Sequence, residues 1–381
     1  MTIQAGKETI YTKDFETALE QTKAPELREL REKAFAYFVE NGFPTPKNEE
    51  WKYTNVAQLI NSEFQFAAGQ EWNHEIDYNL LGQFGYERNG FTALHLALTN
   101  ILFVRIPKDT AQTNPIRFDF ALHGNVAIFP HIIFVVEAGS KATIIETYES
   151  DGGSFTNSAI QIFLADNANL THYRVQKESA EALHVGTTEV SLGRGSLYNS
   201  TNINLGGAIS RHDVHVKFTE EGGEAFLDGL YMLNGNQHHD THSTIDHALP
   251  NCVSHQTYKG VLNDKSRGVF NGKVFVRANA SGTDAQQSNK NLLLSNDARV
   301  DTKPQLEIFN DDVKCSHGAT VGQLEEEELF YLLSRGISQT LAKNLLTYGF
   351  AEEIINKIGI EEIKKDLDEA VLNRLDVKLE A

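Results

Sequence analysis

The sequence has few cysteines and too little positive charge to balance its acidic residues. Its 381 residues include two cysteines, and 34 lysines and arginines stand against 52 aspartates and glutamates, a net charge of −18. Two thiols cannot build a disulfide framework, a four-thiolate zinc site or a complete iron–sulfur cluster within one chain. Nucleic acid and anionic membranes require a basic surface, and no local basic cluster occurs. We therefore expect neither nucleic acid nor membrane as a partner.

Long apolar runs and common catalytic motifs are also missing. The most apolar stretch, residues 126–136, is interrupted by Pro130 and His131 and falls short of the ~18 residues of a membrane span. Residues 1–12 lack the apolar segment of a signal peptide. Neither a phosphate-binding loop ending in Gly-Lys-Ser/Thr nor a Gly-x-Ser-x-Gly elbow occurs. We expect a soluble protein of a reducing compartment, most simply the cytoplasm, that does not hydrolyse ATP through such a loop.

Composition divides the chain into three zones: an N-terminal helical region (1–88), a β-rich core (89–320) and a C-terminal helical region (321–381). In the first zone, residues 25–40 carry apolar side chains at helical spacing, and Pro25 suits a first helical turn. Residues 48–54 form a polar and aromatic stretch that we expect on a short helix or turn.

The core zone is typical of β structure. Short β-branched or aromatic runs alternate with turn residues, and Val214, Val216 and Phe218 alternate with polar residues. The runs are residues 101–104, 132–136 and 160–164, and the expected turns are 222–223, 234–236, 263–264, 271–272, 281–282, 296–297 and 310–311. No convincing helix interrupts the zone, which argues against a doubly wound α/β fold. Its length suits a stacked β-solenoid better than the alternatives, a sandwich or a barrel.

The last zone predicts helices, because five apolar residues between Leu329 and Leu345 recur at intervals of four. Gly336 is expected to end one helix, Ser338 to cap the next and Gly349 to end it, and residues 363–375 form a final amphipathic helix. Two interpretations remain open: core helices packed together, or a module that docks a partner through apolar faces that so short a bundle cannot cover.

A histidine-rich stretch is the first candidate site, with histidines at positions 238, 239, 242, 247 and 255. On a strand, Asp240 and His242 would face one way, and His239 and Thr241 the other. These residue types can bind a transition metal, but their spacing is neither that of His-x-x-x-His on a helix nor that of a zinc finger. We favour a polar ladder that fixes the strand register, and we expect Cys252 to pack in the core.

Cys315 and His317 are the second candidate site. Two positions apart on an extended chain, they share a face, whereas Lys314, next to Cys315 in the sequence, points to the other face. A thiolate beside an imidazole is a soft metal-binding pair, or a nucleophile with a base. Lys314 would favour the thiolate only indirectly, through its charge. A buried thiol with a hydrogen-bonded histidine is the equally open alternative. If the pair binds metal, other ligands must come from elsewhere in the fold or from another chain.

Several long motifs resemble the SufB/SufD family, the paired scaffold proteins of the SUF iron–sulfur cluster assembly system. They are residues 49–54 (EEWKYT), 256–262 (QTYKGVL), 266–274 (SRGVFNGKV), 291–295 (NLLLS), 300–308 (VDTKPQLEI), 315–322 (CSHGATVG) and 330–337 (FYLLSRGI). Gly318 resembles the SufD branch of the family rather than the SufB branch, which typically has Glu at that position. Residues 280–284 and Asn310 depart from the family pattern.

The resemblance implies a right-handed parallel β-helix core with helical ends and no enzymatic activity. It implies a complex in which the core pairs with SufB and the C-terminal helical region contacts the ATPase SufC. It also implies that Cys315 and His317 hold transient iron or a nascent cluster shared with SufB, with no cofactor bound stably by this chain alone. Whether the chain forms a homodimer when alone is left open.

Two other classes of function compete with this one. A β-solenoid rich in acidic residues could be a carbohydrate-active enzyme that works with paired carboxylates. A plain interaction module, with Cys315 as a core thiol, is the third. Turnover of a polysaccharide by the single chain would distinguish the enzyme from the two binding proteins.

Overall fold

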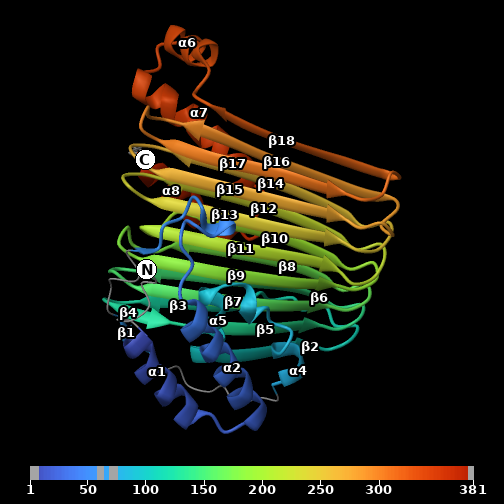
Figure 1. Cartoon of the computed structure of the whole chain (residues 1–381). Helices are drawn as coiled ribbons and strands as arrows, with labels where there is room; N and C mark the ends of the chain where they lie inside the picture. The colour runs from blue at the N-terminus through green and yellow to red at the C-terminus, as the bar shows by residue number, and fades with distance from the viewer. Residues whose placement is uncertain (1–7, 58–63, 68–75, 376–381) are drawn as a thin grey trace.

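The main feature of the molecule is a solenoid of parallel strands (Figure 1). The computed structural model describes residues 8–57, 64–67 and 76–375. The strands form a ten-stranded sheet, here called sheet A, and an eight-stranded sheet, here called sheet B. From β6 onward the chain alternates between the sheets, so that each turn adds one parallel strand to each. The prediction of a mainly β solenoid with helices at both ends is confirmed.

The strand bounds follow the alternation of the two sheets. Sheet A contains β1 (Gln65–Phe66), β2 (Asn100–Ile106), β4 (Val126–Ile128), β5 (Pro130–Val136), β7 (Phe155–Leu164), β9 (Leu183–Leu192), β11 (Ile209–Phe218), β13 (His238–His247), β15 (Arg267–Val276) and β17 (Arg299–Ile308). Sheet B contains β3 (Ile116–Leu122), β6 (Lys141–Ser150), β8 (Asn169–Lys177), β10 (Leu197–Asn204), β12 (Glu224–Leu233), β14 (Val253–Leu262), β16 (Thr283–Leu293) and β18 (Val313–Gly322).

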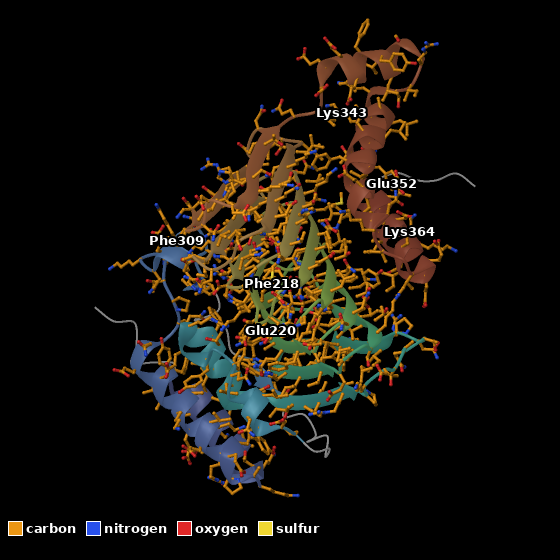
Figure 2. The ribbon with its side chains drawn as sticks, turned by 90° about the vertical axis from the view of Figure 1, so that its right-hand side faces the viewer. Phe218, Glu220, Phe309, Lys343, Glu352 and Lys364 are labelled. Carbon is orange, nitrogen blue, oxygen red and sulfur yellow. The ribbon has the colours of Figure 1, made fainter. Side chains whose placement is uncertain are left out.

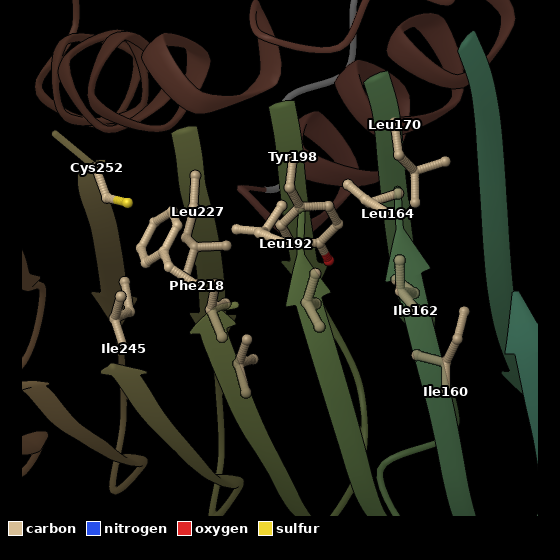
Figure 3. Packing of buried hydrophobic residues seen from close by; sticks show 14 of the residues in the cluster. Ile160, Ile162, Leu164, Leu170, Leu192, Tyr198, Phe218, Leu227, Ile245 and Cys252 are labelled. Atoms are coloured by element: carbon tan, nitrogen blue, oxygen red, sulfur yellow. The ribbon is translucent and has the colours of Figure 1, made fainter. Parts of the chain in front are cut away.

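Every second side chain of a strand points into the space between the sheets, and part of this space is apolar. Figure 3 shows Leu164, Leu192, Phe218 and Ile245 packed there from successive strands of sheet A. Because the strands are parallel and in register, similar residues stack one turn above another, and each turn covers the apolar surface of the one before. Burial of this stack is the main favourable contribution to stability, at about 25 cal/mol per Å² of apolar surface.

The rest of the interior is polar, and many of its groups in the turns nearer the N-terminal helices are hydrogen-bonded to one another. Arg174, 2 % exposed, donates to the amide oxygen of Asn202 at 3.1 Å and contacts the imidazole of His184 at 2.5 Å. The other nitrogen of His184 lies 2.8 Å from the carboxylate of Glu178. Burial lowers the pKa of His184, which favours its neutral form. Buried polar groups are tolerated when they are hydrogen-bonded in this way.

The N-terminal helices cover the first end of the solenoid (Figure 1). They are α1 (Glu8–Gln21), α2 (Pro25–Asn41), α4 (Tyr78–Leu81) and α5 (Gly90–Leu98), with the short turn η2 (Tyr86–Arg88). The short turn η1 (Glu49–Trp51) lies instead against the middle of sheet A. The predicted helix over 25–40 is α2. Helix α5 was not predicted: all nine of its residues are buried, so its apolar sequence has no helical period and resembles a strand.

The opposite end of the solenoid is uncovered. Strands β17 and β18 are the last of their sheets, and each is paired along only one edge within the described residues. Apolar side chains are exposed here: Phe309 is 61 % exposed, Val321 48 % and Ile308 41 %. A free edge of two strands with exposed apolar residues is a template for pairing with another chain.

The C-terminal helices are α6 (Glu326–Ser334), α7 (Gln339–Ile355) and α8 (Glu361–Arg374). Figure 2 shows α7 and α8 along one side of the solenoid, where Ile354 and Leu367 pack on apolar residues of sheet B such as Val175. Helix α6 projects beyond β18 (Figure 1). Of the helices that the structure describes, none has both the length and the apolar character of a membrane span.

Two local predictions were wrong. Gly349 does not end a helix, because α7 continues through it to Ile355. Asn271 and Gly272 lie inside β15 rather than in a turn. A Cβ atom on Gly272 would lie 2.0 Å from the amide nitrogen of Gln287, so glycine is required there by a side chain from the opposite sheet.

Candidate functional site

Cys315 and His317 lie on β18, at the uncovered end of the solenoid. In the register of sheet B, Cys315 is next to Ala285 and His317 is next to Gln287. Cys315 is half-buried against the apolar interior, and His317, on the same face of the strand, is exposed. Lys314 is exposed on the opposite face, as the alternation predicts. The structure therefore brings the two candidate donors to one face at the mouth of the interior.

The Cys315 thiol is not activated in the free chain. Burial raises its pKa, and the nearby carboxylate of Asp284 acts in the same direction. Lys314 does not contribute to this pKa shift, so the indirect stabilisation of the thiolate that was expected from it is not found. A bound metal ion would reverse this preference, because a metal ion displaces the thiol proton when it coordinates sulfur. The arrangement suits a group that becomes a ligand when metal arrives better than a standing nucleophile.

No complete metal site accompanies this pair. Within residues 8–57, 64–67 and 76–375, no group of three or more His, Cys, Asp or Glu side chains is placed to hold a metal ion. A thiol and an imidazole are donors for iron, zinc or an iron–sulfur cluster, but each of these requires more ligands. A metal group bound at β18 would therefore draw further donors from outside this chain or from other kinds of side chain within it.

The histidine-rich strand β13 forms a polar ladder, with the two faces divided as predicted. On the inner face, His239 lies 3.1 Å from the Ser210 hydroxyl and 2.9 Å from that of Thr241. On the same face, His247 contacts the Ser254 hydroxyl at 2.7 Å. Each of these histidines thus has a hydrogen-bonding neighbour on an adjacent or facing strand. Histidines held in this way fix the register of the turns rather than gather around one point.

Cys252 is fully buried in the same interior cluster as Phe218 (Figure 3). Its sulfur contacts the carbonyl oxygens of Glu220 and Pro250 at 3.6 and 3.5 Å. Burial raises the pKa of this thiol, which keeps it protonated. The expected packing role of Cys252 agrees with this environment.

The outer face of β13 binds a segment of the N-terminal zone, residues 48–54, which we call the strap. Trp51 is 2 % exposed, and the Arg211 guanidinium lies 3.9 Å from its ring centroid. The Thr54 hydroxyl donates to Asp240, which also accepts from Arg211 at 2.8 Å. Arg211 gave no signal in the sequence, because its partners lie far away along the chain. The strap ties the N-terminal helices to the middle of sheet A.

His242 is the titratable centre of the strap contact. Its Nε2 lies 3.0 Å from Asp240 and its Nδ1 3.3 Å from Glu50, with Arg211 beside it and Lys273 on the far side of Glu50. Burial lowers the pKa of His242, but the charge of Asp240 and the hydrogen bonds to Asp240 and Glu50 together outweigh burial and raise this pKa above its ordinary value. The hydrogen bond from His242 lowers the pKa of Glu50 to about 2. The pair is therefore fully charged in mildly acidic solution.

This arrangement predicts a pH-dependent free energy of unfolding. The folded-state pKa of His242 lies above its ordinary value of 6.5, so its contribution is complete below pH 6.5 and is lost as the pH rises through the folded value. We expect the urea midpoint to fall between about pH 6 and about pH 8.5, and to fall less in His242→Gln. His123→Gln, at a site 81 % exposed, is the control and should behave as the wild type. An undiminished fall in His242→Gln would contradict the assignment.

A second exposed apolar surface lies on α6 and the start of α7. Phe330 is 72 % exposed and Tyr331 58 %, and Leu341 and Leu345 are 42 % and 46 % exposed. The first turn of α6 is acidic, with glutamates at positions 326, 327 and 328. Ser338 caps α7 by accepting from the backbone of Leu341, as predicted. The interpretation as core helices therefore holds for α7 and α8, which pack on sheet B, whereas Phe330 and Tyr331 of α6 stay exposed.

The chain is similar to known proteins over most of its length. Residues 120–350 match the family model described as "SUF system FeS cluster assembly, SufBD core domain", and residues 5–80 match "SufBD protein N-terminal region". The chain is 33 % identical to the iron–sulfur cluster assembly protein SufD of Escherichia coli over 88 % of this chain and 90 % of that protein. It is 36 % identical to a SufBD family protein of Synechocystis (87 % and 76 %) and 30 % identical to SufD of Bacillus subtilis (74 % and 66 %).

Proposed function

This chain belongs to the SufBD family of the SUF system, and on that premise we propose that it is a non-enzymatic scaffold subunit that assembles iron–sulfur clusters with SufB and SufC. The observation that carries the proposal is the position of Cys315 and His317. Two donors suited to iron and sulfur chemistry lie at the one uncovered end of the described solenoid.

SufB is the proposed partner at this end. The β17–β18 edge offers backbone groups and exposed apolar residues, including Phe309, to a second chain. A partner that extends the solenoid there would cover Cys315 and His317 and bring its own ligands to them. This accounts for a site that is incomplete in one chain and for only two cysteines in its sequence.

SufC is the proposed partner at α6. An exposed Phe330 and Tyr331 beside an acidic helix start suit a docking groove that is apolar at its centre and basic at its rim. Figure 2 shows Lys343 of α7 on the opposite side of the solenoid from Phe309, so the two surfaces are separate. The sequence contains no phosphate-binding loop of its own, and SufC would supply ATP hydrolysis to the complex.

In the proposed mechanism SufC hydrolyses ATP, while this chain and SufB provide the ligands. ATP hydrolysis by SufC shifts the SufB–SufD-type pair and opens the interface at β18. The Cys315 thiol gives up its proton as iron or the nascent cluster binds, and His317 adds an imidazole donor. SufB supplies the remaining ligands, and the cluster leaves as cargo rather than staying as a cofactor.

Reconstitution of the purified complex tests this function. The chain is mixed with SufB and SufC, supplied with ferrous iron and sulfide under anaerobic conditions, and the iron and acid-labile sulfide per complex are counted. We expect a stable three-protein complex that retains more cluster than SufB and SufC without this chain. Failure to form the complex, or equal cluster content in its absence, would contradict the proposal. Turnover of a polysaccharide by the single chain would instead favour the carbohydrate-active alternative.

A further inference from the structure

Gln287 carries the least satisfied polar group of the last solenoid turns. It lies on β16, next to His317 in the register of sheet B. Its side chain is 3 % exposed, yet neither its amide nitrogen nor its amide oxygen has a hydrogen-bond partner in the described part of the chain. A buried amide normally satisfies both atoms, because leaving them unpaired destabilises the fold.

The amide of Gln287 lies between the two sheets. The nearest backbone opposite it is Gly272 of β15, where a Cβ atom would lie 2.0 Å from the Gln287 nitrogen and 2.7 Å from its carbonyl carbon. Two nearby polar atoms are also unpaired: the amide nitrogen of Gln256, on β14, and the hydroxyl of Thr302, on β17. Unpaired polar atoms therefore collect inside the last turns, beneath Cys315 and His317.

Elsewhere in the interior, a comparable glutamine is fully paired. Gln176 donates to Glu178 at 2.6 Å, and its oxygen accepts from Asn204 and, at 2.9 Å, from Ser210. In this turn the chain itself provides partners for both amide atoms of Gln176, although the amide oxygen of Asn204 and the Ser154 hydroxyl lack one. Among the buried side-chain amides of the described residues, Gln287 alone lacks a partner at both atoms, and it lies at the uncovered end of the solenoid.

We propose that the amide of Gln287 is a third binding group of the Cys315–His317 site, donating a hydrogen bond to a sulfide or thiolate sulfur of the bound cargo. Neighbouring strands are about 4.8 Å apart, so a group held on the inner face of β18 is within reach of a long side chain one strand below. Hydrogen bonds to the sulfur atoms set the stability and reduction potential of such clusters. This inference rests on the proposed function.

Gln287→Leu tests the inference through two opposite effects. Replacing an unpaired buried amide with an apolar side chain of similar shape is neutral to stabilising, so the Tm of the isolated chain should stay unchanged or rise by about 1–3 °C. In the complex with SufB and SufC, the same variant should lose iron to a chelator about tenfold faster than wild type, because the bound sulfur loses a hydrogen bond. A residue with a purely structural role would lower the Tm and weaken the site together.

Gln256→Leu, one strand further from β18, is the control for iron release and should lose iron at the wild-type rate, although its Tm should fall because it removes the hydrogen bond that Gln256 accepts from Ser243 at 2.6 Å. A wild-type rate in Gln287→Leu overturns the inference, and so does a lowered Tm, which would show that the amide has a partner in the free chain. Cys315→Ala in the same assay separates a failure of the proposed function from a failure of the inference about Gln287. If Cys315→Ala retains wild-type iron, the proposed function fails; if it loses iron while Gln287→Leu does not, only the role of Gln287 is lost.

Discussion

Cys315→Ala is expected to remove most of the cluster that the complex with SufB and SufC assembles, while the isolated chain stays folded. The expected loss is at least about tenfold in iron and acid-labile sulfide per complex, since even groups that only support metal ligands are worth about 10–100-fold in affinity. The thiol is half-buried and packs only on the edge of the interior. Its removal should therefore lower the free energy of unfolding by about 1 kcal/mol or less.

Cys252→Ala is the matched control, because it removes the other thiol of the chain. Cys252 is fully buried, so its loss should lower stability more than the loss of Cys315, yet leave iron and sulfide at wild-type levels. His317→Ala should reduce cluster content in the same direction as Cys315→Ala with little effect on stability, since the imidazole is exposed. Wild-type cluster content in Cys315→Ala would show that its thiol is not a ligand.

The alternation of side chains along single strands could be predicted from the sequence. On β13 and β18 the division of residues between two faces requires only an extended backbone. It correctly placed Cys315 beside His317, and Asp240 beside His242. Which face is interior, and what fills it, depends on strands about thirty residues away, and so the contact of His239 with Ser210 could be found only in the structure.

The wrong predictions share a cause, which is that tertiary contacts override local preference. Glycine inside a helix is disfavoured by only about 1 kcal/mol, and the packing of α7 on sheet B outweighs that cost at Gly349. Asn271 and Gly272 have the composition of a turn, but Gly272 leaves room for Gln287 from the other sheet. The strap is a further example. Trp51 contacts Arg211, and the two residues lie too far apart in the sequence for a local pattern to predict the contact.

The unpaired amide of Gln287 shows a further limit of sequence reasoning. Its residue type and its place on a strand are ordinary, and its significance lies in partners that are missing from the described part of the chain. By contrast, one feature of the sequence did indicate that the site at the open end is incomplete. Cys315 and His317 were two donors without the others that a metal site requires, and this shortage pointed to further ligands elsewhere in the fold or in another chain.

Phe330→Asp is expected to weaken the binding of SufC about hundredfold or more without unfolding the chain. An apolar anchor at the centre of a docking surface is typically worth ~2–4 kcal/mol, and each 1.4 kcal/mol is about tenfold in Kd. A new carboxylate would also be buried without a partner and would add to the negative charge of the first turn of α6. Because Phe330 is 72 % exposed in the free chain, its Tm should not change.

Phe309→Asp separates this surface from the one proposed for SufB. Phe309 is the same residue type with a similar exposed fraction, 61 %, but it follows β17 at the open end of the solenoid. Phe309→Asp should weaken pairing with SufB and leave the Kd for SufC at the wild-type value. Phe330→Asp should weaken the binding of SufC and leave pairing with SufB unchanged. Titration of each purified variant with each partner by calorimetry measures all four affinities. If Phe330→Asp binds SufC as the wild type does, α6 is not the docking helix, and its exposed aromatic residues require another explanation.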